Sequence, residues 1–381
     1  MTIKVGIVGA RGLSTLQGFR SLPDTEITAL CDLDGEYVQE AAREHGIPRT
    51  YRIYEDMLDS DIDAVVISTP MHLHVPQAIA ALQAGKHVLC EVTAGVTMDE
   101  LWWLKETVEA SDKVYMFAEN YCYIPQNQLI NNLVKQGLLG DIYYGEGEYV
   151  HDVRRLAFQF NRAGSGERNA PTWRKYWQLG KRGNFYPTHS LGPIMKWMEG
   201  DRIRSVSCFG SGWHTDPRFR QEDTSITLCQ MESGKLIKLR TDCISNRPLN
   251  ASQSLQGTKG CVEGPSFLGD GHRIWLDSMG GEPEQRTWRP LSDFNDYLPE
   301  RYKNATEEQR NAGHWGGDFF IVEDFVNAIK GLQKPAIDVY DACEWTAVAL
   351  LSELSVMNGG RVMDMPDFRK SGSYADQIIK L

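Results

Sequence analysis

The chain has 381 residues, of which 41% are apolar and 24% are charged, which is enough material for more than one hydrophobic core. Its 51 Asp and Glu residues exceed its 40 Lys and Arg residues, and the formal charge of -11 argues against nucleic acid as a partner. The composition also excludes a disordered chain and a small disulfide-stapled scaffold, and no apolar run reaches the roughly 18 residues of a membrane span.

The first 122 residues predict a nucleotide-binding domain. Short β-branched runs predict strands at residues 4–8, 26–31, 64–68, 87–90 and 114–118. Amphipathic segments between them predict helices at residues 13–21, 35–45, 75–84 and 99–110. This alternation is typical of βαβ units, so we expect an α/β Rossmann domain with a doubly wound parallel sheet.

The pattern changes in residues 123–381, where we expect a second, α+β domain. A helix is expected at residues 125–136, and longer alternating strands at 142–150, 204–213, 224–231 and 235–243. The turn Glu232-Ser233-Gly234 suits a hairpin between the last two strands. Segments 152–183 and 264–316 show no clear period and are expected to be long ordered loops, followed by helices at 318–330 and 341–358.

These strands predict an open, mostly antiparallel sheet. Because the apolar face of such a sheet needs a cover, we expect a homodimer or homotetramer. The eight cysteines contain no C-x-x-C pair, so we expect reduced thiols and no metal site. The first predicted strand leaves no room for a secretory leader before it, so we expect a cytoplasmic protein that does not associate with membranes.

A glycine-bearing turn follows the first predicted strand and has the sequence Gly9-Ala10-Arg11-Gly12-Leu13-Ser14. A dinucleotide fingerprint has its glycines at this place, where they permit a tight turn and close approach to a diphosphate. Arg11 and Ser14 replace the second and third fingerprint glycines, and an arginine there can itself pair with phosphate. A glycine turn without a ligand is the alternative for this loop taken alone.

Asp32 ends the second predicted strand, where a carboxylate can accept hydrogen bonds from the ribose hydroxyls of a dinucleotide. The residues that follow, 33–36, contain no Lys or Arg to neutralise a 2′-phosphate, which favours NAD over NADP. A helix N-cap is the alternative role for Asp32.

Two further segments resemble the Gfo/Idh/MocA oxidoreductases: Ser68-Thr69-Pro70-Met71-His72-Leu73-His74, and residues 81–91, which end in Lys86-His87-Val88-Leu89-Cys90-Glu91. In that family the Thr-Pro turn lies along the cofactor, and a Glu-Lys-Pro sequence supplies a lysine to the substrate. This chain has Glu91-Val92-Thr93 instead, so the lysine is absent. The resemblance implies an NAD site that adds eight residues to Gly9, Arg11, Gly12, Leu13, Ser14 and Asp32: Ser68, Thr69, Pro70, His72, His74, Glu91, Thr93 and Asn120.

The segment Gly183-Asn184-Phe185-Tyr186-Pro187-Thr188-His189-Ser190-Leu191-Gly192-Pro193 places an imidazole near a phenol, in a loop expected to lead into a helix. Ordinary dehydrogenases of the family carry an aspartate where Phe185 stands. With segments 91–94, 118–120, 147–154, 313–318, 338–342, 351–353 and 366–368, it is similar to the NAD-dependent glycosidase branch, typified by α-N-acetylgalactosaminidase.

That resemblance implies a redox-neutral hydrolysis of a sugar or small glycoside. Oxidation at C3 acidifies the C2 hydrogen, elimination and water addition follow at C1, and the hydride returns to C3. His189 is expected to take the C3 hydroxyl proton, Tyr149 and His151 the proton at C2 or on the leaving group, and Tyr186 to join them. The division of these roles stays open, and a buried structural histidine and an ordinary sheet aromatic are the alternatives for His189 and Tyr149.

Aromatic and cationic residues in one segment suggest a sugar-binding surface, although a solvated loop is the alternative. The expected substrate-binding residues are Trp173, Arg174, Lys175, Asn184, Thr188 and His314. Two other functions stay open at this point: a net NAD-dependent sugar or polyol dehydrogenase, and a nucleotide-linked sugar sensor without catalytic activity.

Overall fold

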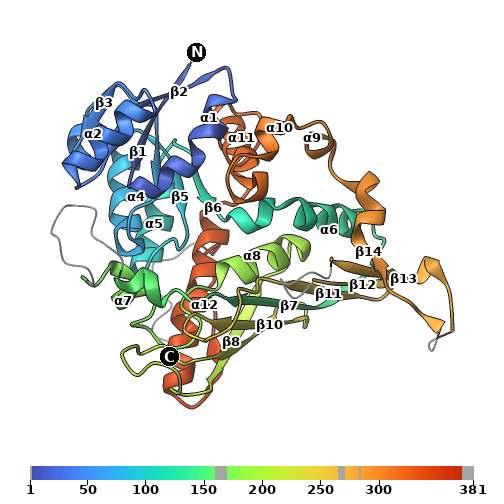
Figure 1. Cartoon of the computed structure of the whole chain (residues 1–381). Helices are drawn as coiled ribbons and strands as arrows, with labels where there is room; N and C mark the ends of the chain where they lie inside the picture. The colour runs from blue at the N-terminus through green and yellow to red at the C-terminus, as the bar shows by residue number, and fades with distance from the viewer. Residues whose placement is uncertain (1, 159–169, 265–270, 283–284, 371–381) are drawn as a thin grey trace.

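The computed structural model describes residues 2–158, 170–264, 271–282 and 285–370, and these form two sheets with helices around them (Figure 1). The first sheet is parallel throughout, and its strands in spatial order are β3 (Arg49–Tyr51), β2 (Thr25–Cys31), β1 (Ile3–Val8), β4 (Ala64–Ile67), β5 (His87–Glu91) and β6 (Tyr115–Ala118). The order reverses beside β1, as in a doubly wound Rossmann sheet, so the predicted fold of this half is confirmed.

The helices of this half connect successive strands: η1 (Ala10–Thr15), α1 (Leu16–Arg20), α2 (Gly35–Glu44), α3 (Tyr54–Leu58), η2 (Met71–Leu73), α4 (His74–Gln83) and α5 (Met98–Glu109). Helix α5 starts at a capping box, in which Thr97 and Glu100 bond to each other's backbone N–H groups. The predicted helix at 13–21 begins instead as the 3-10 helix η1 at Ala10. Strand β3 and helix α3 were not predicted, because three and five residues are too few to show a period.

The second sheet is mixed, and its strands in spatial order are β14 (Arg289–Pro290), β13 (Arg273–Leu276), β12 (Gly260–Glu263), β11 (Gln253–Gly257), β7 (Ile142–Val150), β10 (Leu236–Asp242), β9 (Ser225–Met231), β8 (Ile203–Gly210) and β15 (Met363–Asp364). Only β7 and β10 pair in parallel among the described strands of this sheet, so the expected mostly antiparallel sheet is confirmed. The expected hairpin joins β9 to β10, with Gly234 at a φ of 90°.

The remaining helices are η3 (Asn120–Tyr123), α6 (Pro125–Lys135), η4 (Arg154–Phe158), α7 (Trp173–Trp177), α8 (Thr188–Trp197), η5 (Asp277–Met279), η7 (Leu291–Tyr297), α9 (Glu300–Lys303), α10 (Glu307–Arg310), η8 (His314–Gly316), α11 (Gly317–Ile329) and α12 (Val339–Met357). The expectation of long loops at 152–183 and 264–316 is therefore wrong. These segments contain η4 and α7, and β13, β14, α9 and α10, each too short to show a hydrophobic period. Parts of both segments, 159–169, 265–270 and 283–284, lie outside the described residues.

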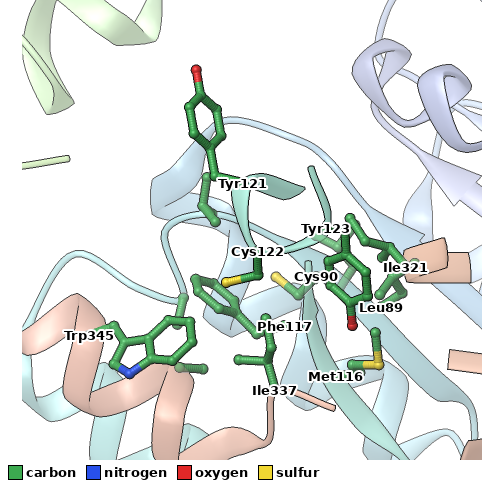
Figure 2. Packing of buried hydrophobic residues seen from close by; sticks show 14 of the residues in the cluster. Leu89, Cys90, Met116, Phe117, Tyr121, Cys122, Tyr123, Ile321, Ile337 and Trp345 are labelled. Atoms are coloured by element: carbon green, nitrogen blue, oxygen red, sulfur yellow. The ribbon is translucent and has the colours of Figure 1, made fainter. Parts of the chain in front are cut away.

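Helix α8 lies above the second sheet, on the side that faces the Rossmann domain (Figure 1). The last helices of the chain return to the Rossmann domain, where α11 packs on α1 and α12 on α5 and β6. Figure 2 shows this junction, in which Trp345 of α12 lies beside Phe117 and Cys122. Within the described ranges, no helix has both the length and the apolar character that crossing a membrane requires.

Candidate active site

A cavity of about 430 Å³ lies at the carboxyl ends of β1, β2, β4 and β5 and extends to α7 and α8. Parallel sheets bind ligands at this edge, next to the point where the strand order reverses. The fold brings many of the predicted residues into the wall of this one cavity: Gly9, Arg11, Ser14, Asp32, Ser68, Thr69, Pro70, Glu91, Asn120, Trp173, Arg174, Tyr186, His189 and His314.

The glycine loop fits a dinucleotide. Gly9 has a φ of 90°, and a Cβ atom there would lie 2.8 Å from the Ser68 carbonyl oxygen, so only glycine suits this position. The Ser68 hydroxyl is 3.0 Å from the carbonyl oxygens of Val8 and Gly9, so it ties the loop to the end of β4. Asn120 presents a buried Oδ1 that has no partner among the described residues, which leaves an acceptor for a ligand.

Asp32 and Asp34 follow strand β2 and differ in what their side chains contact. The side chain of Asp34 caps α2 by accepting the Tyr37 N–H at 3.0 Å. Asp32 instead lines the cavity, and its Oδ1 accepts the Asp34 N–H at 3.1 Å. Arg52 lines the same end, with its Nη2 3.5 Å from the Leu33 carbonyl oxygen, and it was not predicted because the short strand β3, which was also not predicted, precedes it.

His74 and His72 lie behind the wall rather than in it. The ring nitrogens of His74 lie 2.6 and 2.8 Å from the carbonyl oxygens of Thr93 and Thr69, so the imidazole braces two loops beside the cavity. His72 stacks on Trp177, with ring centroids 5.2 Å apart, and links η2 to α7. Burial lowers the pKa of both histidines, and in His74 the hydrogen bonds to the Thr93 and Thr69 carbonyls oppose this shift. Gly12, Leu13 and Thr93 also lie outside the cavity lining.

His189 belongs to the first turn of α8, so its expected place in a loop is wrong. The helix starts directly after Pro187 and runs on through Pro193. It packs closely on β7 because Gly147 of β7 has no side chain. A Cβ atom on Gly147 would overlap the Ser190 carbonyl of α8. The rings of Tyr149 and Tyr186 each lie 5.1 Å from the His189 ring between centroids, so helix and strand form one cluster.

Glu119 fixes the tautomer of His189, and the sequence argument did not assign it. The two side chains meet at 2.8 Å between Oε1 and Nδ1, and the carboxylate is fully buried. The same Oε1 accepts the Tyr121 N–H at 3.0 Å. Because the Glu119 carboxylate accepts the hydrogen bond, Nδ1 of His189 carries the proton, and Nε2 is left as a proton acceptor. His189 is therefore held by a side-chain carboxylate and not only by backbone.

Tyr149, near the end of β7, and His151, just after this strand, form a hydrogen-bonded pair. The phenol oxygen lies 2.9 Å from His151 Nδ1. Burial raises the pKa of Tyr149 well above its ordinary value. Burial, with the nearby Arg174 and His189, lowers the pKa of His151. Both shifts favour the neutral forms, so the phenol can donate to Nδ1. The two side chains lie just behind the cavity wall.

Tyr121 also belongs to the aromatic cluster around His189, and it was not predicted from the sequence. Its ring stacks on His189, with centroids 4.3 Å apart and planes at 24°. Figure 2 shows Tyr121 pointing away from the hydrophobic cluster that buries its neighbours. Burial raises the pKa of Tyr186 to about 12, so this phenol is also neutral at physiological pH.

The predicted substrate residues are only partly brought together. Arg174 lies over the Trp173 ring at 4.5 Å and donates from Nη1 to the Gln178 Oε1 at 2.6 Å. Lys175 contacts the Phe158 ring at 5.0 Å and lies outside the cavity lining. Asn184 and Thr188 are fully buried behind the wall.

Comparison with known proteins gives two matches to family models. Residues 123–375 match the C-terminal domain of glycosyl hydrolase 109, and residues 3–119 match an oxidoreductase family with an NAD-binding Rossmann fold. A glycosyl hydrolase family 109 protein of Saccharopolyspora erythraea is 33% identical, over 97% of this chain and 84% of its own length. An α-N-acetylgalactosaminidase of Shewanella oneidensis is 31% identical, over 97% of this chain and 85% of its own length.

Solved structures share the fold at lower identity. A levoglucosan dehydrogenase in complex with NADH superposes with a TM-score of 0.79 and 20% identity, over 96% of this chain and 100% of that chain. A scyllo-inositol dehydrogenase from Lactobacillus casei superposes with a TM-score of 0.69 and 18% identity, over 95% of this chain and 98% of that chain.

Proposed function

Because the chain belongs to glycosyl hydrolase family 109 and carries an NAD-binding Rossmann domain of the Gfo/Idh/MocA type, we propose that it is a glycosidase that hydrolyses its substrate without net redox change. The observation that carries this proposal is the pairing of His189 with Glu119 beside the Tyr149 and His151 unit. His189 lines the NAD cavity and the Tyr149 pair lies directly behind it, so the cluster holds two separate proton-transfer groups, as elimination and re-addition require.

Bound NAD would supply a hydride acceptor and then a hydride donor at C3 of the sugar, and the C3 ketone makes the C2 hydrogen acidic. His189 takes the C3 hydroxyl proton on Nε2, because Glu119 keeps the other ring nitrogen protonated. The same Nε2 gives this proton back when the hydroxyl is re-formed. Glu119 stabilises the imidazolium between the two events.

Tyr149 and His151 transfer the protons that accompany bond breaking at C1 and C2. The neutral pair can release one proton to the leaving oxygen and accept one from C2, so it returns to its starting state after each elimination. Water then adds to C1, the C2 proton is restored, and the products are the free sugar and the released alcohol. Atoms and charges balance with water as the only reactant consumed.

Two substitutions support hydrolysis over net dehydrogenation. Val92 lines the cavity at the position of the family's substrate lysine, and Phe185 is buried at the position of its aspartate. Neither side chain can carry a proton. His189 and the Tyr149 pair are the acid and base groups to which we assign the proton transfers, in accord with the glycosidase branch.

The test is turnover of p-nitrophenyl glycosides in buffered D₂O. Release of nitrophenol without accumulation of NADH, together with deuterium at C2 of the product, supports the proposal. One NADH formed for each oxidised sugar establishes a net dehydrogenase instead. Binding of NADH and sugar without any conversion establishes a sensor.

We also expect a homodimer or homotetramer that covers the outer face of the second sheet. This face is less apolar than expected, because Lys238 pairs with Glu146 at 2.6 Å and Arg240 with Glu148 at 3.5 Å in its centre. Leu228 and Phe209 remain exposed beside them, at 36% and 57%. Sedimentation equilibrium measures the assembly, and a monomer at all concentrations contradicts the expectation.

A further inference from the structure

A second carboxylate–histidine pair borders the cavity, formed by Asp318 and His314. Both carboxylate oxygens of Asp318 lie 2.8 Å from His314 Nδ1. On the other side of the ring, Arg11 donates from Nη2 to His314 Nε2 at 2.7 Å. A guanidinium can only donate, so Nε2 must be the unprotonated nitrogen and Nδ1 carries the proton. The two partners therefore allow a single neutral tautomer of His314.

The backbone around His314 is held in an unfavourable conformation. His314 and Trp315 have φ angles of 45° and 58°, in the left-handed region that side chains other than glycine rarely adopt. Such a conformation persists only where surrounding contacts hold it. Asp318 is such a contact, because it is buried and fills the space that a Cβ atom on Gly313 would need.

The pair acts on the NAD loop through Arg11. Arg11 replaces the second glycine of the fingerprint and lines the cavity together with His314, Asp318 and Glu91. Its Nε lies 3.9 Å from the Glu91 carboxylate, so the guanidinium lies between a group of the Rossmann domain and one from η8. A guanidinium has five N–H donors, and these two contacts use at most two of them, which leaves donors for a phosphate oxygen.

We propose that Asp318 is a positioning residue for cofactor retention, which holds His314 in the tautomer that fixes Arg11 in the diphosphate-binding loop. This inference rests on the proposed function in one respect: an enzyme that returns its hydride gains from keeping the same NAD through many turnovers. The contact between Arg11 and His314 joins the two domains at the wall of the cavity. Loss of the Asp318 carboxylate should then release Arg11 and speed the departure of the cofactor.

The test measures the release of NADH, which needs no turnover. Protein preloaded with NADH is mixed with excess NAD⁺, and the decay of NADH fluorescence gives the dissociation rate. We expect Asp318→Asn to raise this rate about tenfold, because the amide can donate to Nδ1 and favour the other tautomer. Glu323→Gln is the matched control on α11, since Glu323 pairs with Arg301 away from the cavity.

A double-mutant cycle separates positioning from a general structural effect. If Asp318 acts through Arg11, Asp318→Asn changes the rate less than twofold in an Arg11→Gln background. An equal increase in both backgrounds overturns the proposal, as does an unchanged rate in the wild-type background. Arg11→Gln alone tests the same contact if Asp318→Asn does not fold, because the Arg11 side chain is 57% exposed, and an unchanged NADH release rate there overturns the proposal.

Nitrogen-15 spectra of His314 give a second readout that a merely structural role would not move. The wild-type spectrum should show a protonated Nδ1 and an unprotonated Nε2, and Asp318→Asn should shift the ring toward the other tautomer. Unchanged ring resonances in the variant overturn the proposal. If the glycosidase assay fails while NADH release follows these expectations, the proposed function fails and the positioning role stands.

Discussion

The cavity is bordered by two carboxylate–histidine pairs that differ in what the second imidazole nitrogen meets. In both, a buried carboxylate accepts from Nδ1 at 2.8 Å. His314 Nε2 is already engaged by Arg11, whereas the His189 ring lies within the aromatic cluster and lines the cavity. We therefore assign different purposes to the same two residue types: one imidazole accepts a proton, and the other holds a cation.

The difference shows why residue type alone does not assign a role. A carboxylate sets the tautomer, and the group opposite decides whether the exposed nitrogen can do acid–base chemistry.

His189→Asn should have the largest effect, because it removes the only ring nitrogen that we assign to the C3 hydroxyl proton. We expect turnover of a nitrophenyl glycoside to fall about 10³-fold or more. The dissociation constant for NADH should change less than about twofold, since the substitution leaves the His314–Asp318 pair and its contact with Arg11 intact. His214→Asn, on an exposed histidine that bonds to the Ser211 carbonyl, is the control. Weak turnover caused by loss of NADH binding would contradict this assignment.

Glu119→Gln should rank second, because it keeps the shape of the site but no longer dictates the His189 tautomer. We expect the turnover number to fall about 10²-fold to 10³-fold, with a smaller change in the Michaelis constant. The melting temperature reports separately on the loss of the bond to the Tyr121 N–H. Activity within threefold of the wild type would show that Glu119 only supports the fold.

Tyr149→Phe removes the phenol and keeps the ring that packs against His189. We expect turnover to fall about 10²-fold, together with slower deuterium incorporation at C2 in D₂O. Tyr144→Phe is a matched control on the same strand, because its phenol bonds to Glu146 on the outer face of the sheet. Equal losses in the two variants would mean that the effect comes from β7 as a whole.

Glu91 lies beside Arg11 in the cavity wall, together with His314 and Asp318. Glu91→Gln tests its protonation through the pH dependence of the free energy of unfolding. Burial, opposed by Arg11, raises the pKa of Glu91 to about 7 from an ordinary value of 4.5, so the folded protein prefers the protonated form. Stability from this group is complete at low pH and is lost as pH rises toward 7. Relative to wild type, the cofactor-free variant should gain about 2 kcal/mol between pH 5.5 and 8.5.

Urea unfolding at both pH values measures this gain, and Glu106→Gln on the exposed side of α5 should show no such trend. A constant difference between Glu91→Gln and the wild type would mean that Glu91 is ionised throughout this range.

The sequence predicted the Rossmann half better than the second half, for physical reasons. Strands such as β4 are buried on both faces and read as uninterrupted apolar runs, and their helices alternate with them at regular spacing. Strands β13 and β14 have four and two residues, and their pairing comes from neighbours rather than from their own pattern.

The site residues divide in the same way, into those that local sequence places and those that tertiary packing places. Gly9 and Asp32 are recognisable because a local loop and strand place them, and the fold puts both in the cavity wall. Glu119 and His189 are 70 positions apart, and only the packing of α8 on β7 and η3 brings them together. Arg52, directly after β3, lines the cavity for the same reason. Motif spacing cannot reveal contacts that depend on how distant elements pack.

The return of the C-terminal helices has a consequence for recombining members of this family. Trp102 of α5 packs on Phe368, with ring centroids 4.8 Å apart, and the Phe117 N–H donates to the Ile337 carbonyl at 3.0 Å. A nucleotide-binding half cut out at residue 122 would therefore present bare apolar surface to water. Chimaeras that exchange this half between relatives should carry the chain from residue 337 onward with it, so that crossovers lie at two places in the gene rather than one.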